Sequence, residues 1–344
     1  MKIISVLFNP LLRRMFIGSL AVIVLSCSSD PHDVDISDVQ VDMTIRRLDQ
    51  DLFHHSEDDF RALNAQLKEK YDTFYKDYLM DIIAVGRPND PMVHVHLEQF
   101  VNDPNWQETQ AQIDRIFPDL RDVNNSFELA FRYHRYHFPD QEIPDLVYYN
   151  SGFNIGVYPT DQVLGIGLEW FLGPESPVIQ RLALESFPQY FKDKLRPEYL
   201  VNNSVKGWLL VKHQELLGKE ELLNLMIFHG KILYLMDAIF PKVSDEVKMN
   251  YSTEELEWCI KNEYNIWAHL IDAELLYTSK PKDLAGFIND GPFTPAFQQG
   301  SPARTGMWLG WQIVRQYMDK NSDVSLKEML QEDNPQKMLK YYKP

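Results

Sequence analysis

One stretch decides the fold of this chain: Lys219-Glu-Glu-Leu-Leu-Asn-Leu-Met-Ile-Phe-His-Gly-Lys-Ile-Leu-Tyr-Leu-Met-Asp-Ala-Ile-Phe240. Apolar residues fall on nearly every side of a helix drawn through it, and a helix that is apolar all round lies inside a core. A polar insert, His229-Gly230-Lys231, lies in the middle. Glycine inside a helix costs about 1 kcal/mol relative to alanine, so Gly230 indicates that another part of the chain approaches closely. The stretch therefore predicts a central core helix over 219–240.

The same insert resembles part of a zinc-peptidase helix. There the pattern His-Glu-x-x-His places two imidazole ligands one turn apart, with a glutamate as the base. This chain has His229-Gly230-Lys231-Ile232-Leu233, so one ligand is kept while the base and the second ligand are replaced. One ligand without a base does not build a three-ligand catalytic zinc site. Two interpretations of His229 stay open: a core histidine hydrogen-bonded to a neighbour, and a functional histidine that takes part in binding.

The N-terminus has the pattern of an export signal. Basic residues precede a short apolar run that ends in Val24-Leu25-Ser26-Cys27. The run is too short for a membrane span, and its end resembles a bacterial lipobox, in which the cysteine is acylated. We predict a signal peptide over 1–26, lipidation of Cys27 and an acylated tether over 27–35; the alternative is a cleaved secretory signal with an incidental cysteine. The predicted partner is the lipid bilayer, and the predicted location is the cell envelope, facing the periplasm.

The chain is acidic, with a formal net charge of −16. Removing residues 1–26 takes away Lys2, Arg13 and Arg14 and no acidic residue, so the net charge becomes −19. A domain with this charge is not expected to bind nucleic acid or anionic lipid nonspecifically. Besides Cys27 the chain has one cysteine, Cys259, which makes no intramolecular disulfide. Its apolar neighbours indicate that it is buried.

The first part of the mature chain, 36–142, is predicted to be helical after one strand. Alternating apolar residues predict the strand over 36–48. Helices are predicted over 49–73, 71–85, 91–102, 105–117 and 119–138. His134 and His137 are three residues apart and share a helical face, but Arg132 and Arg135 surround them. The pattern favours a surface cluster over a metal site.

A sheet is predicted over 143–173. Strands at 145–150, 153–158 and 162–169 are joined by short links, which is typical of an antiparallel meander. Gly165 and Gly167 within one strand indicate a close backbone approach. Helices over 177–184 and 197–216 then lead to the central helix. A meander before a His-bearing core helix is the order of the N-terminal part of a zincin, so we predict one predominantly helical α+β domain over 36–344, a degenerate zincin-like fold.

The remaining segment, 174–344, is predicted to hold the core and C-terminal helices. Ser252-x-x-Glu255 is a capping box that starts a helix at Thr253. On that helix Glu263 corresponds to the third ligand of a zincin, and the alternative is a solvated or capping acid.

A last long helix follows a proline-rich loop. Ser301-Pro302 has the pattern of its start. Gly306 and Gly310 lie four residues apart on one face and indicate another close approach. Arg304 and Arg315 could pair with acids of the chain or bind a carboxylate.

Four segments together carry a resemblance to a known family. They are Tyr148-Tyr-Asn-Ser-Gly-Phe-Asn-Ile-Gly, Phe228-His-Gly-Lys-Ile-Leu-Tyr234, Trp258-Cys-Ile-Lys-Asn-Glu-Tyr-Asn-Ile-Trp267 and Gly306-Met-Trp-Leu-Gly-Trp-Gln-Ile-Val-Arg-Gln-Tyr-Met318. With the lipobox, they make essentially the whole chain resemble the gliding-motility lipoprotein family GldB of Bacteroidota. The resemblance implies a cell-envelope lipoprotein that is needed for gliding and linked to type IX secretion. It also implies a distant relation to zinc-peptidase-like domains.

Three functional hypotheses follow. The first is a non-catalytic lipoprotein of the gliding and secretion machinery that needs no cofactor or metal and binds protein partners through a cleft lined by His229, Lys231, Glu263, Arg304 and Arg315. The second is a metal-dependent hydrolase with a rearranged site, in which His229 and Glu263 bind a metal together with Glu274 or His269. The third is a purely structural envelope lipoprotein.

Overall fold

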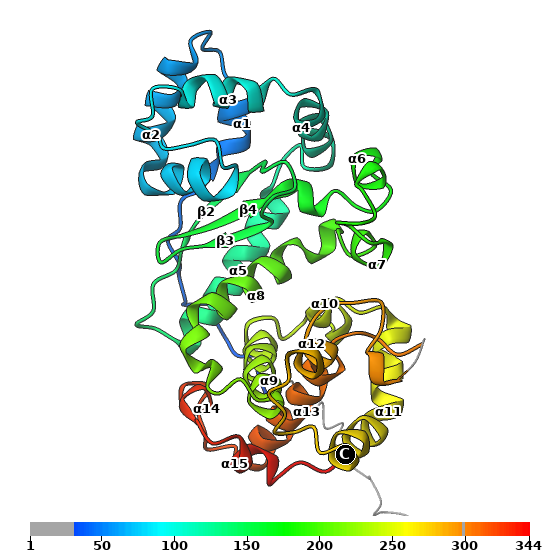
Figure 1. Ribbon diagram of the computed structural model, residues 1–344. Coiled ribbons are helices and arrows are strands. Elements are labelled where there is room, and N and C mark those ends of the chain that lie inside the picture. Colours follow the sequence, from blue (N-terminus) through cyan, green and yellow to red (C-terminus); the bar gives the residue numbers. More distant parts are fainter. Residues whose placement is uncertain (1–30, 298–299) are drawn as a thin grey trace, which may run out of the picture. The chain divides into compact units, whose positions relative to one another are not determined.

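The fold is organised around two packed helices, α9 (Leu222–Ile239) and α13 (Thr305–Lys320) (Figure 1). The computed structural model describes residues 31–297 and 300–344, and those from His32 to Pro344 form one compact unit. The predicted signal peptide and Cys27 lie outside the described residues. Among those that are described, α9 is the one helix that is long and apolar enough to cross a membrane, and 78% of it is buried. The prediction of a central core helix is confirmed.

The two helices cross where each has a glycine. A Cβ on Gly230 would lie 2.3 Å from the carbonyl oxygen of Gly310, and a Cβ on Gly310 would lie 1.9 Å from that of Met226. These distances are far below van der Waals contact, so the backbones touch directly. The close approach that Gly230 and Gly310 indicate is confirmed, and so is that of Gly306, whose Cβ would lie 2.9 Å from Phe287.

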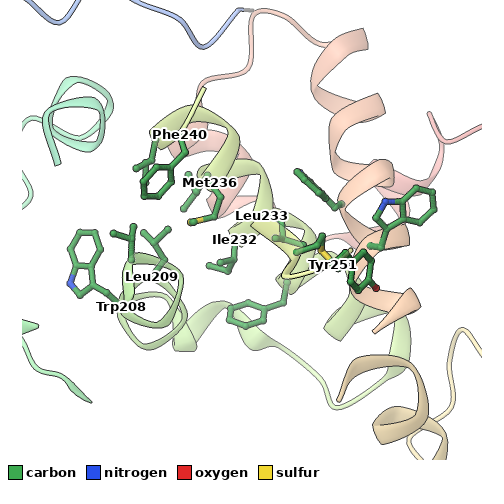
Figure 2. Close-up of a cluster of buried hydrophobic side chains, with 14 of the residues drawn as sticks. Trp208, Leu209, Ile232, Leu233, Met236, Phe240 and Tyr251 are labelled. Atoms are coloured by element: carbon green, nitrogen blue, oxygen red, sulfur yellow. The ribbon is translucent and has the colours of Figure 1, made fainter. Parts of the chain in front are cut away.

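Side chains of α9 fill the core on both sides of this crossing. Figure 2 shows Trp208 and Leu209 of α8 (Leu200–Lys212) near Ile232 and Met236 of α9. All four are buried. Fully burying one such side chain contributes about 1.5–3 kcal/mol, which explains why so apolar a helix folds in water.

The sheet has four short strands in the order β1-β2-β4-β3. They are β1 (Ile45–Arg47), β2 (Asp145–Tyr149), β3 (Val157–Pro159) and β4 (Val163–Gly167). The strand β2 runs parallel to β1 and to β4, and only β3 and β4 are antiparallel. The prediction of an antiparallel meander is therefore wrong, because the sheet is mixed. The zincin-like part of the predicted fold is not confirmed and stays a prediction.

A buried carboxylate explains why β2 and β3 form no hairpin. The loop after β2 wraps around Glu169, whose Oε1 accepts hydrogen bonds from the Ser151 backbone N–H at 2.8 Å and the Phe153 N–H at 3.2 Å. The loop reaches this geometry with positive φ angles of 65° at Gly152 and 63° at Phe153. The loop thus contains residues 151–153, which the sequence pattern assigned to a tight turn and to the start of the next strand. As a result β4, and not β3, pairs with β2.

The alternation of side chains along β2 divides the apolar residues into two cores. Leu146 and Tyr148 face the larger core with α5 (Arg121–His137), α8 and α9. Val147 and Tyr149 face the smaller core with α1 (Leu48–Phe53), α2 (Phe60–Asp77) and α3 (Val93–Val101). Figure 1 shows these two groups of helices on opposite faces of the sheet. A Cβ on Gly165 would lie 2.7 Å from the ring of Phe74, so the predicted close approach at this strand is confirmed.

The chain over 48–82 is divided differently from the predicted helices over 49–73 and 71–85, because α1 ends at Phe53 and α2 continues to Asp77, followed by a π-helical turn over Tyr78–Ile82. The other helices have the following bounds. They are α1 (Leu48–Phe53), α2 (Phe60–Asp77), α3 (Val93–Val101), α4 (Pro104–Ile116), α5 (Arg121–His137), α6 (Pro177–Arg181), α7 (Gln189–Lys192), α10 (Asp245–Met249), α11 (Thr253–Asp272), α12 (Pro281–Ile288), α14 (Leu326–Gln331) and α15 (Pro335–Leu339). The capping box of Ser252 and Glu255 is present at α11. Cys259 is fully buried, as predicted.

Two local predictions are wrong. The long helix does not begin at Ser301-Pro302, because the Pro302 carbonyl accepts the Thr294 N–H at 3.0 Å and closes a loop, and Arg304 then caps α13 with a left-handed φ of 59°. His134 does not belong to a surface cluster. It is fully buried, and its ring contacts those of Trp208 and Phe138.

Burial of His134 makes the stability of the fold depend on pH. Desolvation, with smaller contributions from the nearby positive charges, lowers its pKa to about 3. In the unfolded chain His134 binds a proton below about pH 6.5, whereas in the folded chain it stays neutral down to about pH 3. The free energy of unfolding therefore falls as the pH is lowered from about 6.5 to about 3. The variant His134→Phe lacks this titrating group. We expect the difference in unfolding free energy between the variant and wild type to shift by about 2 kcal/mol in favour of the variant when the pH is lowered from 7.5 to 5. Urea unfolding at both pH values tests this, and an unchanged difference would contradict it.

Candidate functional site

His229 lies on α9 and is half-buried. Its Nδ1 atom is buried and has no hydrogen-bond partner among the described residues. Burial, followed by the charges of Lys206 and Arg304, lowers its pKa to about 4. The ring is therefore neutral at pH 7. The predicted hydrogen bond to a neighbour is absent at Nδ1 in the described part of the chain.

Arg304 lies near His229 and is held within the fold. Its Nη2 donates to the carbonyl oxygen of Asn250 at 3.2 Å, its Nε lies 3.6 Å from Asp290, and its guanidinium lies 5.3 Å from the ring centre of Tyr251. It is thus positioned by two separate segments, the one that contains Asn250 and Tyr251 and the one that contains Asp290. Of the predicted site residues, only His229 and Arg304 are close enough for the charge of one to affect the pKa of the other.

Lys206 of α8 is a further cation at this place. Its Nζ donates to the carbonyl oxygen of Lys248 at 2.9 Å. Burial, followed by the charge of Arg304, lowers its pKa to about 7. His229, Lys206 and Arg304 are thus close enough for their charges to interact. His229 is neutral above about pH 4, and Lys206 loses its proton near pH 7. The loss of these charges reduces the repulsion among the three side chains.

Lys231 points to a different part of the fold. It is buried, and its Nζ donates to the carbonyl oxygens of Leu330 at 3.0 Å and Glu332 at 2.6 Å. Leu330 lies in the last turn of α14, where carbonyl oxygens have no partner within the helix, and Glu332 directly follows its end. Burial lowers the pKa of Lys231 to about 8. Lys231 therefore joins the tail to α9.

The residues proposed as metal ligands do not converge. Glu263 accepts a hydrogen bond from the Tyr342 hydroxyl at 2.9 Å, and partial burial raises its pKa. The ring of His269 contacts Phe287 and Phe297, and Glu274 lies after the end of α11 with a φ of 54°. Within 31–297 and 300–344, no group of three His, Cys, Asp or Glu residues is arranged to hold a metal ion.

Arg315 takes part in a buried ion-pair network. Its guanidinium donates to Asp237 at 2.8 Å and to Asp245 at 2.7 Å, and it stacks 3.7 Å from the ring centre of Trp311. Nζ of Lys248 donates to Oδ1 of Asp237 at 2.8 Å, and the same oxygen also accepts from Nη2 of Arg315. Of the two options for Arg315, the structure shows pairing with acids of the chain.

Sequence reasoning missed Asp237, which anchors this network. The signal was present, because a single carboxylate in a helix that is apolar all round must be buried with a partner. Burial alone would raise the pKa of Asp237, but the hydrogen bonds and charges of Arg315 and Lys248 lower it. The five predicted site residues thus lie at four separate places in the described part of the chain.

Helix α11 carries three of the large apolar side chains that are exposed among the described residues. Ile260 is 59% exposed, Tyr264 67% and Ile271 45%. Trp267 lies between them in sequence and is half-buried. Spacings of four, three and four residues place these side chains on one side of a helix, so they form what we call the α11 stripe.

These features define a class: a predominantly helical α+β domain with a small mixed sheet, whose interior charges are bound within the fold and whose apolar α11 stripe is exposed. The particular family follows from comparison with known proteins. The chain belongs to the family of the gliding motility protein GldB, whose family model matches residues 29–344. Membership implies involvement in gliding motility. No curated protein and no solved structure matches the chain.

Proposed function

We propose that the chain is a membrane-anchored cell-envelope lipoprotein that serves gliding motility and the associated type IX secretion as a non-catalytic binding or assembly component. Family membership supports the role in gliding. The lipobox pattern ending at Cys27 supports the anchor. The link to secretion rests on the resemblance of the sequence to the lipoproteins of this family.

Contacts inside the fold support the non-catalytic part of the proposal. Lys231 binds backbone carbonyls, Arg315 binds two aspartates, and Glu263 binds a tyrosine hydroxyl. Side chains that are bound in this way stabilise tertiary structure and are not free to bind a substrate. The distant relation to zinc peptidases would then concern descent and not activity.

The α11 stripe is the observation that carries the proposal. Exposed apolar side chains that form a continuous row along a helix are typical of a surface that binds another protein. The stripe is flanked by acidic residues and one lysine, which are Glu257, Glu263, Asp272, Glu274 and Lys261. We propose that its partner is an amphipathic helix with basic flanks, from another protein of the gliding machinery.

Placing a charge in the stripe tests this proposal. We expect cells whose only copy carries Ile260→Asp to lose colony spreading, because a carboxylate would have to be desolvated at the interface. The side chain is 59% exposed, and surface substitutions usually change stability by less than ~0.5 kcal/mol. The variant should therefore accumulate and unfold like wild type.

The matched control is Leu184→Asp, which also replaces an aliphatic side chain with aspartate. Leu184 is 59% exposed, as Ile260 is, but it lies between α6 and α7. This control should spread normally. Normal spreading of the Ile260→Asp cells, with the protein at wild-type level, would show that the stripe binds no partner needed for gliding.

A further inference from the structure

An apolar pocket of about 350 Å³ opens on another face of the domain. It lies among α5, α8 and the segment that follows α9, with Leu129, Val201, Phe240 and Val243 in its lining. Pockets for small ligands occupy ~300–1,000 Å³ and are mostly apolar with a few polar groups, so this one has the size and chemistry to hold part of a lipid chain. Leu129 remains 47% exposed at its opening.

The N-terminal segment of the described chain is attached beside this pocket. The carboxylate of Asp33 accepts a hydrogen bond from the Tyr133 hydroxyl at 3.1 Å and lies 3.2 Å from Nζ of Lys242, and both of these residues line the pocket. Arg132 of α5 binds the carbonyl oxygens of Ile36 at 2.6 Å and Val39 at 2.8 Å. These contacts fix the place from which the chain continues toward Cys27.

Chain length then limits how far the pocket can lie from a membrane anchor. Five residues lie between Cys27 and Asp33, and the six Cα-to-Cα steps that join these two residues span at most about 20 Å. If Cys27 is acylated, as the proposed function requires, the face of the domain that carries the pocket stays within about 20 Å of the bilayer surface. Tyr136, 46% exposed on the same helix as Leu129, adds an aromatic side chain of the kind enriched at membrane interfaces.

The rim of the pocket favours a particular headgroup. Its lining includes the carboxylates of Asp122 and Glu198 and the ammonium group of Lys242, whose side chain stays 72% exposed while it pairs with Asp33. A phosphoethanolamine group has a phosphate to match the lysine and an ammonium to match a carboxylate. An anionic lipid offers no ammonium group to these two carboxylates.

We propose that this pocket binds one acyl chain of phosphatidylethanolamine from the membrane that anchors the protein. The lipid would orient the domain on the bilayer and leave the α11 stripe available to a protein partner. The inference rests on the proposed lipid anchor at Cys27.

The test uses the full acylated protein in vesicles of phosphatidylethanolamine that carries a photoactivatable diazirine in one acyl chain. After irradiation, mass spectrometry maps the adducts. We expect adducts on the peptides that contain Leu129, Val201 and Phe240. Leu129→Asp should reduce them about tenfold, because the apolar contact is lost and a charge is added. The control Leu184→Asp should leave them unchanged.

Flotation of the protein with the vesicles separates the possible failures. If the protein floats but its pocket peptides carry no adduct, or if Leu129→Asp keeps them, the inference is wrong while the anchor stands. Occupation of the pocket by the anchor's own acyl chains, which carry no diazirine, would also leave it unlabelled and would overturn the inference. A protein that does not float lacks the anchor, and both the inference and that part of the proposed function fail.

Discussion

Replacing Gly310 with alanine is expected to prevent the domain from folding stably. The new Cβ would lie 1.9 Å from the carbonyl oxygen of Met226, which belongs to the backbone of α9 and cannot rotate away. The two central helices would have to separate, and every contact between them would be loosened. Overpacking of a core typically costs ~1–3 kcal/mol and can cost more when backbone must move. We expect a loss above ~3 kcal/mol, a large part of the ~5–15 kcal/mol that holds a typical domain together.

Urea unfolding of the purified protein measures this loss, with Gly207→Ala as the matched control. Gly207 also lies inside a helix, but its Cβ would lie 3.2 Å from a methyl group of Val157, a side chain that can adjust. Alanine is also the better helix former by about 1 kcal/mol. The control should therefore be close to wild type. A Gly310→Ala protein as stable as the Gly207→Ala protein would contradict the direct contact between α9 and α13.

The second large effect is expected at Asp237. Replacing it with alanine removes the carboxylate between two cations, Lys248 at 2.8 Å and Arg315 at 2.8 Å, and also the acceptor of the Trp311 indole N–H. Arg315 keeps Asp245, but the buried Lys248 is left without an acid. Breaking a buried ion pair from one side costs ~3–5 kcal/mol. We expect Asp237→Ala to lower the unfolding free energy by about this amount.

Two further variants separate charge from packing. Asp237→Asn keeps the shape and one acceptor oxygen, so its loss should be smaller than that of Asp237→Ala. Glu257→Ala breaks the exposed pair with Lys261, whose atoms are 2.9 Å apart, and should have little effect. Equal losses for Asp237→Ala and Glu257→Ala in thermal unfolding would show that the network adds nothing to stability.

The central part of the fold could be predicted because its signals are local. A helix that is apolar all round is stable in water only when it is buried. Gly230 and Gly310 are both explained by the direct contact between the two helix backbones. The strand order could not be predicted in this way. It depends on a loop that binds the carboxylate of Glu169, and this interaction joins residues that are 18 apart in sequence.

The candidate site was predicted less well, for a related reason. Sequence spacing showed which charged residues were unusual but not which partner each would find. Arg315 and Lys231 lie on the two core helices, and each reaches a different neighbour, Asp237 for one and the end of α14 for the other. The α11 stripe and the apolar pocket became visible only once the exposure of each side chain was known.

We propose that the interior of this protein is structural and that its surface carries the function. The most direct measurement is the gliding speed of single cells whose only copy carries His229→Ala, with protein level and melting temperature measured alongside. His229 is the one residue kept from the zinc-peptidase pattern, and its buried Nδ1 has no partner in the described part of the chain. We expect the cells that carry His229→Ala to glide at wild-type speed. Loss of gliding by cells with a normal amount of folded His229→Ala protein would contradict it and would place a working site at α9.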